Sequence, residues 1–181
     1  MSDDSETIGA RGETGKDPGE MTLPALTHVD AAGDFHMVDV GGKPVTDRVG
    51  VASGYIRMEP STLKAIQQNT LNKGDVIPVA RVAGIQAAKR TAELIPLCHP
   101  LPLSDIQVRV SVDEALPGLR VEGTVRTTAR TGVEMEALTA VAVSLLTIYD
   151  MAKAVDRTMT ISEIRLREKR GGMSGEFIAD P

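Results

Sequence analysis

Apolar and polar residues alternate along the chain with two different periods, and the changes of period predict the order of its elements. Residues 48–58 alternate with the period of a strand, and 61–68 follow as a short helix. A second helical stretch runs over 75–94, with Asp75 as its cap and Pro96 beyond its end. The first half of the folded chain is therefore predicted as a strand followed by helices.

The second half contains a clear hairpin pattern. Residues 105–114 and 119–129 both alternate with period two on either side of the turn segment ALPG, which predicts a β-hairpin. The sequence TGVE matches a capping box, with Thr131 as the cap and Glu134 reaching back to it. It predicts a helix over 131–155.

A last strand over about 158–168 completes the order β-α-β-β-α-β. This order is the split βαβ arrangement of an α+β fold, in which an antiparallel sheet packs two helices on one face. The predicted fold is therefore ferredoxin-like, with an N-terminal extension. Within that extension, FHMVDV at 35–40 is either an additional edge strand or an arm.

The N-terminal residues differ in composition from the rest of the chain. The first twenty hold six acidic and two basic side chains, with Met1 and Ile8 as their large apolar residues. Such a segment buries too little apolar surface to offset the entropy of ordering it. We therefore expect a disordered acidic tail over 1–24 and a single domain over 25–178, which is long enough to close a hydrophobic core.

Charge and aromatic content disfavour a nucleic-acid partner. After the first twenty residues, 18 basic and 19 acidic side chains nearly cancel. The chain has two Phe, two Tyr and no Trp. A nearly neutral domain with few aromatic rings offers neither a broad cationic surface nor platforms on which bases stack.

Other classes are disfavoured by local features. The uncharged run 137–149 is too short to span a bilayer, and the N-terminus lacks the pattern of a signal peptide. A single cysteine, Cys98, excludes an internal disulfide and a Cys-rich zinc site. His28, His36 and His99 lack the spacing of metal ligands. We expect a cytoplasmic protein with neither membrane contact nor a metal site.

Asp150 and Lys153 are the first candidates for chemistry. They stand three residues apart at the end of the predicted helix 131–155, so their side chains share one helix face. One interpretation is an ion pair at the helix C-terminus, where a lysine also suits the helix dipole. The other is an acid/base pair, because a lysine beside a carboxylate in an apolar setting can have its pKa shifted into a useful range. Burial decides between the two.

Glu136 lies fourteen positions before Asp150 on the same predicted helix. At 1.5 Å per residue the two are roughly 21 Å apart along its axis, too far for one small ligand to contact both. If both residues serve one substrate, they come from different subunits, and the site lies at an oligomer interface. Alternatively, Glu136 only places a negative charge in the first turn of the helix, where it suits the dipole.

Residues 94–105, LIPLCHPLPLSD, hold Cys98 and His99 between prolines in a stiff connection. A rigid backbone here favours positioning of His99, although a loop histidine is also commonly a hydrogen-bonded structural residue. Adjacent Cys and His residues seldom face each other, so the pair is a weak signature of a nucleophile.

Cationic side chains gather beside predicted element ends, where they suit phosphate groups. The glycine-rich GGMSG segment adds backbone N–H groups, but it lacks the spacing and the lysine of a P-loop. Taken singly, these charges are also typical of solvated surface. The cations are Lys73, Arg81, Lys89, Lys169 and Arg170.

Three long segments resemble one known family. They are KGDVIPVARVAGIQAAKRTAELIPLCHPLPLS, TGVEMEALTAVAVSLLTIYDMAKAV and KRGGMSGEF. They are similar to the cyclic pyranopterin monophosphate synthases of molybdenum cofactor biosynthesis, the MoaC family. The resemblance runs from about Leu26 to Phe177 and leaves the acidic tail outside.

The resemblance implies a ferredoxin-like fold and a lyase acting on 3′,8-cyclo-7,8-dihydroguanosine 5′-triphosphate. The implied products are cyclic pyranopterin monophosphate and pyrophosphate. It also implies a homo-oligomer, a hexamer built as a trimer of dimers with sites between subunits, which agrees with the separation of Glu136 and Asp150. No prosthetic group or other cofactor is implied, because acid/base groups and cations suffice for this rearrangement.

The resemblance also assigns residues by motif. IYDMAK gives Asp150 and Lys153 as the catalytic pair. The implied substrate contacts are Leu97, Cys98 and His99 of LCH, Met135 and Glu136 of GVEMEA, Lys73 of KGD, Lys89 of AAKR, Arg48 of TDR and Lys169 of REKRGG. Two positions depart from the pattern: Met173 stands where relatives often carry a lysine, and Val51 where they often carry an arginine.

A non-catalytic module remains the alternative hypothesis. A guanosine-nucleotide-binding or regulatory domain could use the same scaffold, because a fold alone does not fix a function. A purely structural assembly subunit is the weakest alternative, since it leaves the charged pair at the end of an uncharged helix without a purpose.

Overall fold

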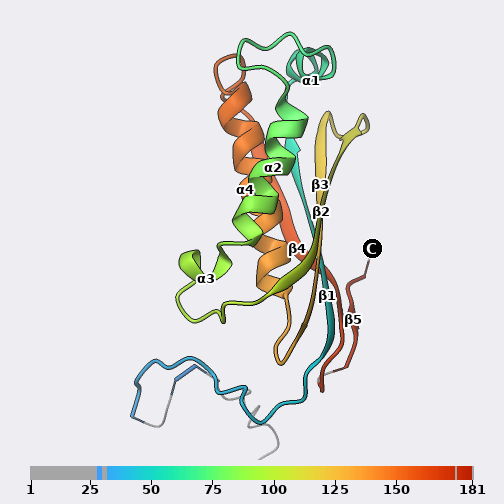
Figure 1. The fold of residues 1–181 in the computed structure, drawn as a ribbon. Coiled ribbons are helices and arrows are strands. Elements are labelled where there is room, and N and C mark those ends of the chain that lie inside the picture. Colours follow the sequence, from blue (N-terminus) through green and yellow to red (C-terminus); the bar gives the residue numbers. More distant parts are fainter. Residues whose placement is uncertain (1–27, 30–31, 174, 181) are drawn as a thin grey trace, which may run out of the picture.

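An antiparallel sheet forms one layer of the protein and helices cover one of its faces (Figure 1). The computed structural model describes residues 28–29, 32–173 and 175–180. The strands are β1 (Thr46–Arg57), β2 (Leu103–Asp113), β3 (Gly118–Ala129), β4 (Thr160–Arg170) and β5 (Phe177–Ile178). They lie side by side in the order β2-β3-β1-β4-β5, with every neighbouring pair antiparallel. The predicted α+β class and the β2–β3 hairpin are confirmed.

Two long helices run next to each other over this sheet. The helices are α1 (Pro60–Gln67), α2 (Val76–Ala88), α3 (Thr91–Leu94) and α4 (Glu134–Ala152). α4 packs on the central strands β1, β3 and β4, while α2 packs beside α4 and over β2 (Figure 1). The short helices α1 and α3 lie near opposite ends of this pair (Figure 1).

The predicted helix over 75–94 is confirmed over most of its length but is interrupted at residues 89–90. The helix α2 ends at Ala88, and α3 begins only at Thr91. The buried Thr91 hydroxyl donates a 3.0 Å hydrogen bond to the Ala88 carbonyl, which would otherwise need an N–H of the next turn. Asp75 does occupy the N-cap position of α2, but its side chain makes no capping hydrogen bond.

The predicted capping box is also wrong. α4 begins at Glu134 with Val133 as its N-cap, and no side chain caps the helix. The Glu134 carboxylate instead lies over Gly132 and pairs with Lys169 of β4, at 3.4 Å between Oε1 and Nζ. A contact between α4 and β4 has therefore taken the side chain that the local motif assigned to the backbone.

The ends of the chain differ partly from expectation. Residues 36–44 form neither helix nor strand, and Phe35 makes a single bridge to Val29. FHMVDV is therefore the beginning of an arm, residues 36–44, rather than an edge strand. The two-residue strand β5 was not predicted from the sequence. The predicted disordered tail over 1–24 lies outside the described residues.

Small side chains let the two long helices approach closely. Ala80 and Gly84 of α2 face Ala140 and Ser144 of α4, all of them buried. The Ser144 hydroxyl donates a 3.0 Å hydrogen bond to the Ala80 carbonyl. By length and composition alone α4 could cross a membrane, but more than half of its apolar window is buried in the core.

We predict that Gly84→Ala destabilises the protein. Alanine is better than glycine in an exposed helix by about 1 kcal/mol. Here, however, a Cβ would lie 2.2 Å from Ser144 Oγ and 2.8 Å from the Ala140 carbonyl oxygen. Overpacking of this kind costs about 1–3 kcal/mol, so the urea midpoint should fall. Gln86→Ala, at an exposed position of α2, is the control, and a raised midpoint for Gly84→Ala would contradict the packing described.

Candidate functional site

Five of the predicted contact residues line one cavity. It has a volume of about 410 Å³ and lies between the segment after α3 and the first turn of α4. Val38, Val40 and Lys43 of the arm line its remaining side. The five are Leu97, Cys98, His99, Met135 and Glu136.

Glu136 is the buried acid of this cavity. Its residue surface is only 4% exposed, and burial raises the pKa of its carboxyl to about 7. A hydrogen bond from the backbone lowers the pKa, and the neighbouring Glu134 carboxylate raises it further. At neutral pH the carboxyl is therefore close to half protonated, a state in which it can give or take a proton.

Cys98 is a thiol rather than a thiolate. Burial raises its pKa first, and the negative charge of Glu136 raises it further. A cysteine nucleophile needs the opposite environment, a nearby cation or a helix N-terminus that stabilises the thiolate. Cys98 is thus suited to packing against a ligand rather than to attacking it.

His99 and Lys89 extend the site toward α2. His99 is half-buried, and its Nε2 lies 2.9 Å from the carbonyl oxygen of Val38. Lys89, the C-cap of α2, lines a second cavity of about 270 Å³ together with His99 and Glu136. His99 and Glu136 line both cavities, so Lys89 belongs to the same site as this imidazole and this carboxyl.

Arg48 and Lys169 lie outside the lining of the two cavities, and both side chains contact other protein groups. Arg48 is 6% exposed, and its guanidinium donates to the carbonyls of Ala129 and Arg130 at 3.4 and 3.2 Å. It also packs under Gly172, where a Cβ would clash with it. Arg48 therefore connects the end of β3 with the glycine-rich segment after β4. Lys169 forms an ion pair with Glu134 in the first turn of α4.

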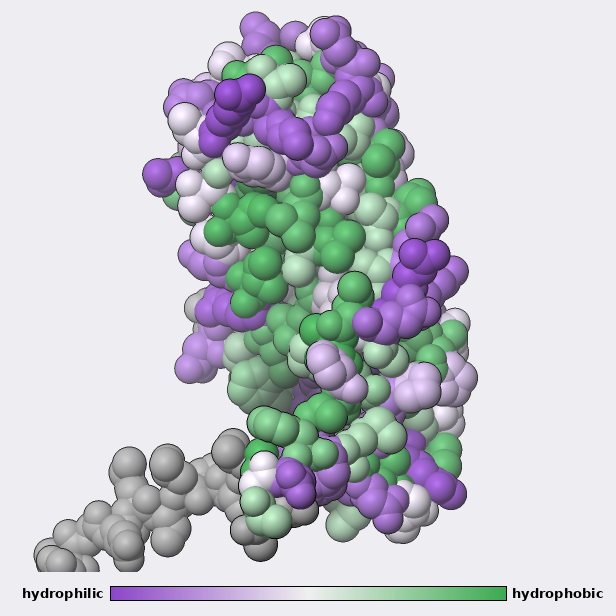
Figure 2. Space-filling model, turned by 90° about the vertical axis from the view of Figure 1, so that its left-hand side faces the viewer, coloured by the Kyte–Doolittle hydropathy of each residue, from purple (hydrophilic) through white to green (hydrophobic). Residues whose placement is uncertain are grey.

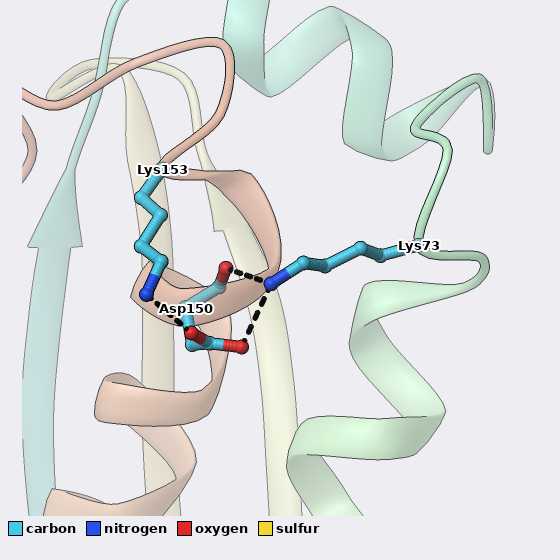
Figure 3. A network of polar contacts seen from close by, with 3 residues as sticks. All are labelled: Lys73, Asp150 and Lys153. Carbon is cyan, nitrogen blue, oxygen red and sulfur yellow. Dashed lines mark hydrogen bonds and ion pairs between the residues drawn. The ribbon is translucent and has the colours of Figure 1, made fainter.

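The other predicted residues meet at the far end of α4 (Figure 3). Asp150 lies between two lysines, with Lys153 Nζ 2.7 Å from Oδ1 and Lys73 Nζ 2.9 Å from Oδ2. Lys73 also donates to the Asp150 backbone carbonyl at 2.8 Å. The shared helix face expected for Asp150 and Lys153 is confirmed, and Lys73 joins them from the loop before α2.

The apolar setting that an acid/base pair needs is absent from the single chain. The side chains of Lys73, Asp150 and Lys153 are 45%, 57% and 50% exposed. Hydrogen bonds from Lys153 and then Lys73 lower the pKa of Asp150 to about 2, so it stays a carboxylate at neutral pH. Within one chain the geometry is that of a solvated ion-pair network.

Two clusters thus lie at opposite ends of one continuous helix. Glu136 is in the first turn of α4 and Asp150 in its last, which at 1.5 Å per residue separates them by roughly 21 Å. α2 runs antiparallel to α4, because Lys73 before α2 contacts Asp150 while Lys89 after α2 lies near Glu136. Each cluster therefore contains an acid of α4 and a lysine that flanks α2.

Sequence reasoning missed the arm and Glu134 as parts of the site. His28 and Lys43 line the larger cavity, and Glu134 contacts Lys169 there. The one signal was the segment FHMVDV, which predicted an edge strand or an arm without indicating what it would contact. Within 28–29, 32–173 and 175–180, no group of three or more His, Cys, Asp and Glu side chains could hold a metal ion.

The raised pKa of Glu136 predicts a pH-dependent stability. Between about pH 4.5 and 7 the native state binds more protons at this carboxyl than the unfolded chain does, so the free energy of unfolding falls as pH rises. Glu136→Gln should lack this fall, gaining on the order of 1–3 kcal/mol relative to wild type across the window. Urea midpoints measured from pH 4.5 to 8 test this, with the exposed Glu114→Gln as control. Parallel curves for wild type and Glu136→Gln would contradict the assignment.

Comparisons with known proteins identify the family of this chain. The sequence profile of the MoaC family matches residues 37–172, a range that includes the arm from Met37 and all elements from β1 to β4. A cyclic pyranopterin monophosphate synthase of Dinoroseobacter shibae is 57% identical over 158 residues, which cover 87% of this chain and 100% of the relative. This chain belongs to the MoaC family.

Proposed function

We propose that this protein is a cyclic pyranopterin monophosphate synthase of molybdenum cofactor biosynthesis. It converts 3′,8-cyclo-7,8-dihydroguanosine 5′-triphosphate to cyclic pyranopterin monophosphate and releases pyrophosphate. The observation that carries the proposal is the 57% identity along the whole length of a relative with that name. Both candidate clusters fall within the matched range. The proposal includes a cytoplasmic location and a single domain over 25–178.

The fold proposed for this domain is ferredoxin-like. The major elements follow the order strand, helix, two strands, helix, strand, with α1 and α3 as additions between β1 and β2. The first four strands stand in the order β2-β3-β1-β4. These two features are what the split βαβ arrangement requires.

The two clusters have complementary chemistry in the proposed reaction. Glu136, with a pKa near 7, moves protons on the ring of the nucleotide, beside His99 and Lys89. Lys73 and Lys153 bring two ammonium groups to one carboxylate, so the cluster keeps a net positive charge. Such a cluster stabilises a triphosphate and its leaving pyrophosphate, and its lysines serve as proton donors. The carboxylate of Asp150 accepts hydrogen bonds from both ammonium groups and so orients them.

The active site is shared between subunits in this proposal. One nucleotide cannot contact both ends of α4, so the Asp150 end of one copy must meet the Glu136 end of another. A neighbouring copy would also exclude water from the exposed ion-pair network and supply the burial that proton transfer needs. We propose the hexamer that the family resemblance implies, a trimer of dimers.

The helix-covered side of the molecule offers an apolar surface for such assembly (Figure 2). Val79 and Val82 of α2 are 45% and 55% exposed, and Leu146 of α4 is 58% exposed. Leu94 of α3 adds a further exposed apolar side chain near the first cavity. Contiguous apolar surface of this kind is typical of protein–protein contacts.

Asp150→Asn and Lys153→Ala should each abolish most turnover without dissociating the oligomer. Loss of a positioned acid/base group lowers kcat by about 10²–10⁴-fold. Pyrophosphate release and product formation from the cyclised nucleotide give the rates, and native mass spectrometry gives the assembly. Lys64→Ala, an exposed lysine of α1, is the control. Full turnover in either variant would refute the catalytic assignment, and nucleotide binding without pyrophosphate release by the wild type would indicate a regulatory module.

A shared site predicts complementation between two inactive variants. Glu136→Ala and Asp150→Ala each lack one cluster. In a mixed oligomer, some sites take the Glu136 cluster from an Asp150→Ala copy and the Asp150 cluster from a Glu136→Ala copy. After unfolding and refolding of an equal mixture, about a quarter of the sites should be complete, and about that share of wild-type activity should return. Mixed oligomers without activity would place both clusters of a working site in one chain.

A further inference from the structure

The arm is attached to the folded body through the imidazole of His99. Residues 36–44 have no regular secondary structure, yet Val38, Val40 and Lys43 form one side of the larger cavity. The carbonyl of Val38 lies 2.9 Å from His99 Nε2, sixty-one residues away along the chain. In the part of the chain that the structure describes, this is the one hydrogen bond that joins residues 35–45 to the chain beyond residue 45.

This contact fixes which ring nitrogen carries a proton. A backbone carbonyl only accepts hydrogen bonds, so Nε2 must be the N–H of the neutral ring. The other nitrogen, Nδ1, then has a free lone pair in the neutral ring and an N–H in the imidazolium. Among the described residues Nδ1 has no hydrogen-bond partner, although His99 lines both cavities of the site.

The backbone around His99 leaves the ring orientation to the arm. Pro96, Pro100 and Pro102 stiffen the segment, and the Cys98 N–H closes a turn on the Ile95 carbonyl at 3.1 Å. The stiff segment sets the position of the His99 Cα, but rotation about the side-chain bonds remains possible. Among the described residues, the Val38 carbonyl is the one hydrogen-bond partner of the ring, and it selects among those rotations.

We propose that the arm, residues 36–44, is a positioning element that makes Nδ1 the atom of His99 offered to the nucleotide. In the neutral ring Nδ1 accepts a hydrogen bond from an N–H or O–H group of the substrate, and in the imidazolium it donates one. The arm and the substrate thus hold opposite sides of one imidazole. This inference rests on the proposed function only in the identity of the ligand, because the arm contact exists without it.

Two substitutions separate the two sides of the ring. The side-chain nitrogen of asparagine lies near the position of Nδ1, and that of glutamine near the position of Nε2. His99→Gln should keep the arm in place but lower kcat/KM for the cyclised nucleotide by about tenfold or more, the effect of one lost hydrogen bond in a site. His99→Asn should release the arm, so that the backbone amides of 36–44 exchange hydrogen for deuterium at least about tenfold faster.

His36→Gln and His36→Asn are matched controls on the arm itself. The His36 ring is exposed, and the structure gives it no hydrogen bond among the described residues. Neither control should change exchange over 36–44, because the contact with His99 is made by the backbone of Val38. Gln86→Asn, at an exposed position of α2 outside the arm and both cavities, should leave kcat/KM unchanged. Unchanged exchange in His99→Asn, or full kcat/KM in His99→Gln, would overturn the proposal.

A measurement on the unmodified protein keeps the proposal testable if a variant fails to fold. The chain has three histidines, so ¹⁵N-labelled imidazole signals can be assigned with the His36 variants as references. In the neutral ring of His99, Nε2 should show the shift of a protonated nitrogen and Nδ1 that of an unprotonated one. The reverse pattern overturns the inference. Exchange and tautomer do not depend on turnover, so an inactive wild type would count against the proposed function alone.

Discussion

The close packing of α4 against α2 and the central strands determines where the acids of α4 and the lysines that flank α2 lie. Gly84 and Ser144 bring the two helices together at their middle, and a hydrogen bond from Ser144 to the Ala80 carbonyl fixes their register. Because the helices are antiparallel, that register places Lys73 over Asp150 at one end and Lys89 near Glu136 at the other. A slip of one turn, about 5.4 Å, would separate both lysines from their acids.

The same packing gives the two acids of α4 opposite electrostatic environments. Glu136 lies where α4, the stiff segment after α3 and the arm converge, and burial raises its pKa to about 7. Asp150 lies beyond the edge of the core, where two ammonium groups lower its pKa to about 2. One helix thus carries an acid that changes charge near neutral pH and another that does not. In the proposed reaction the first acid suits proton transfer, and the second holds the two lysines whose charges suit a leaving pyrophosphate.

The sequence predicted local features well and contacts with other parts of the chain poorly. The β2–β3 hairpin and the extent of α4 follow from periodicity within short windows, which the tertiary structure leaves intact. The capping box failed because Lys169, thirty-five residues after Glu134, attracts the carboxylate that the motif assigned to the helix terminus. The break after Ala88 depends on one buried hydroxyl, that of Thr91, and helix propensity does not reveal it.

The candidate site shows the same limit. Spacing alone placed Asp150 and Lys153 on one face, since i and i+3 are always neighbours in a helix. The sequence and the family resemblance indicated Lys73 only as a cation for the substrate and not as a partner of Asp150, because it joins that cluster from a loop seventy-seven residues away in sequence. Burial of Glu136 and exposure of Asp150 could not be assigned either, because both flank an uncharged run and differ only in what packs around them. Exposure of the Asp150 network in one chain bears directly on the proposed function: the proposed proton transfer needs a dry setting, which a second copy or the substrate would have to supply by covering these charges.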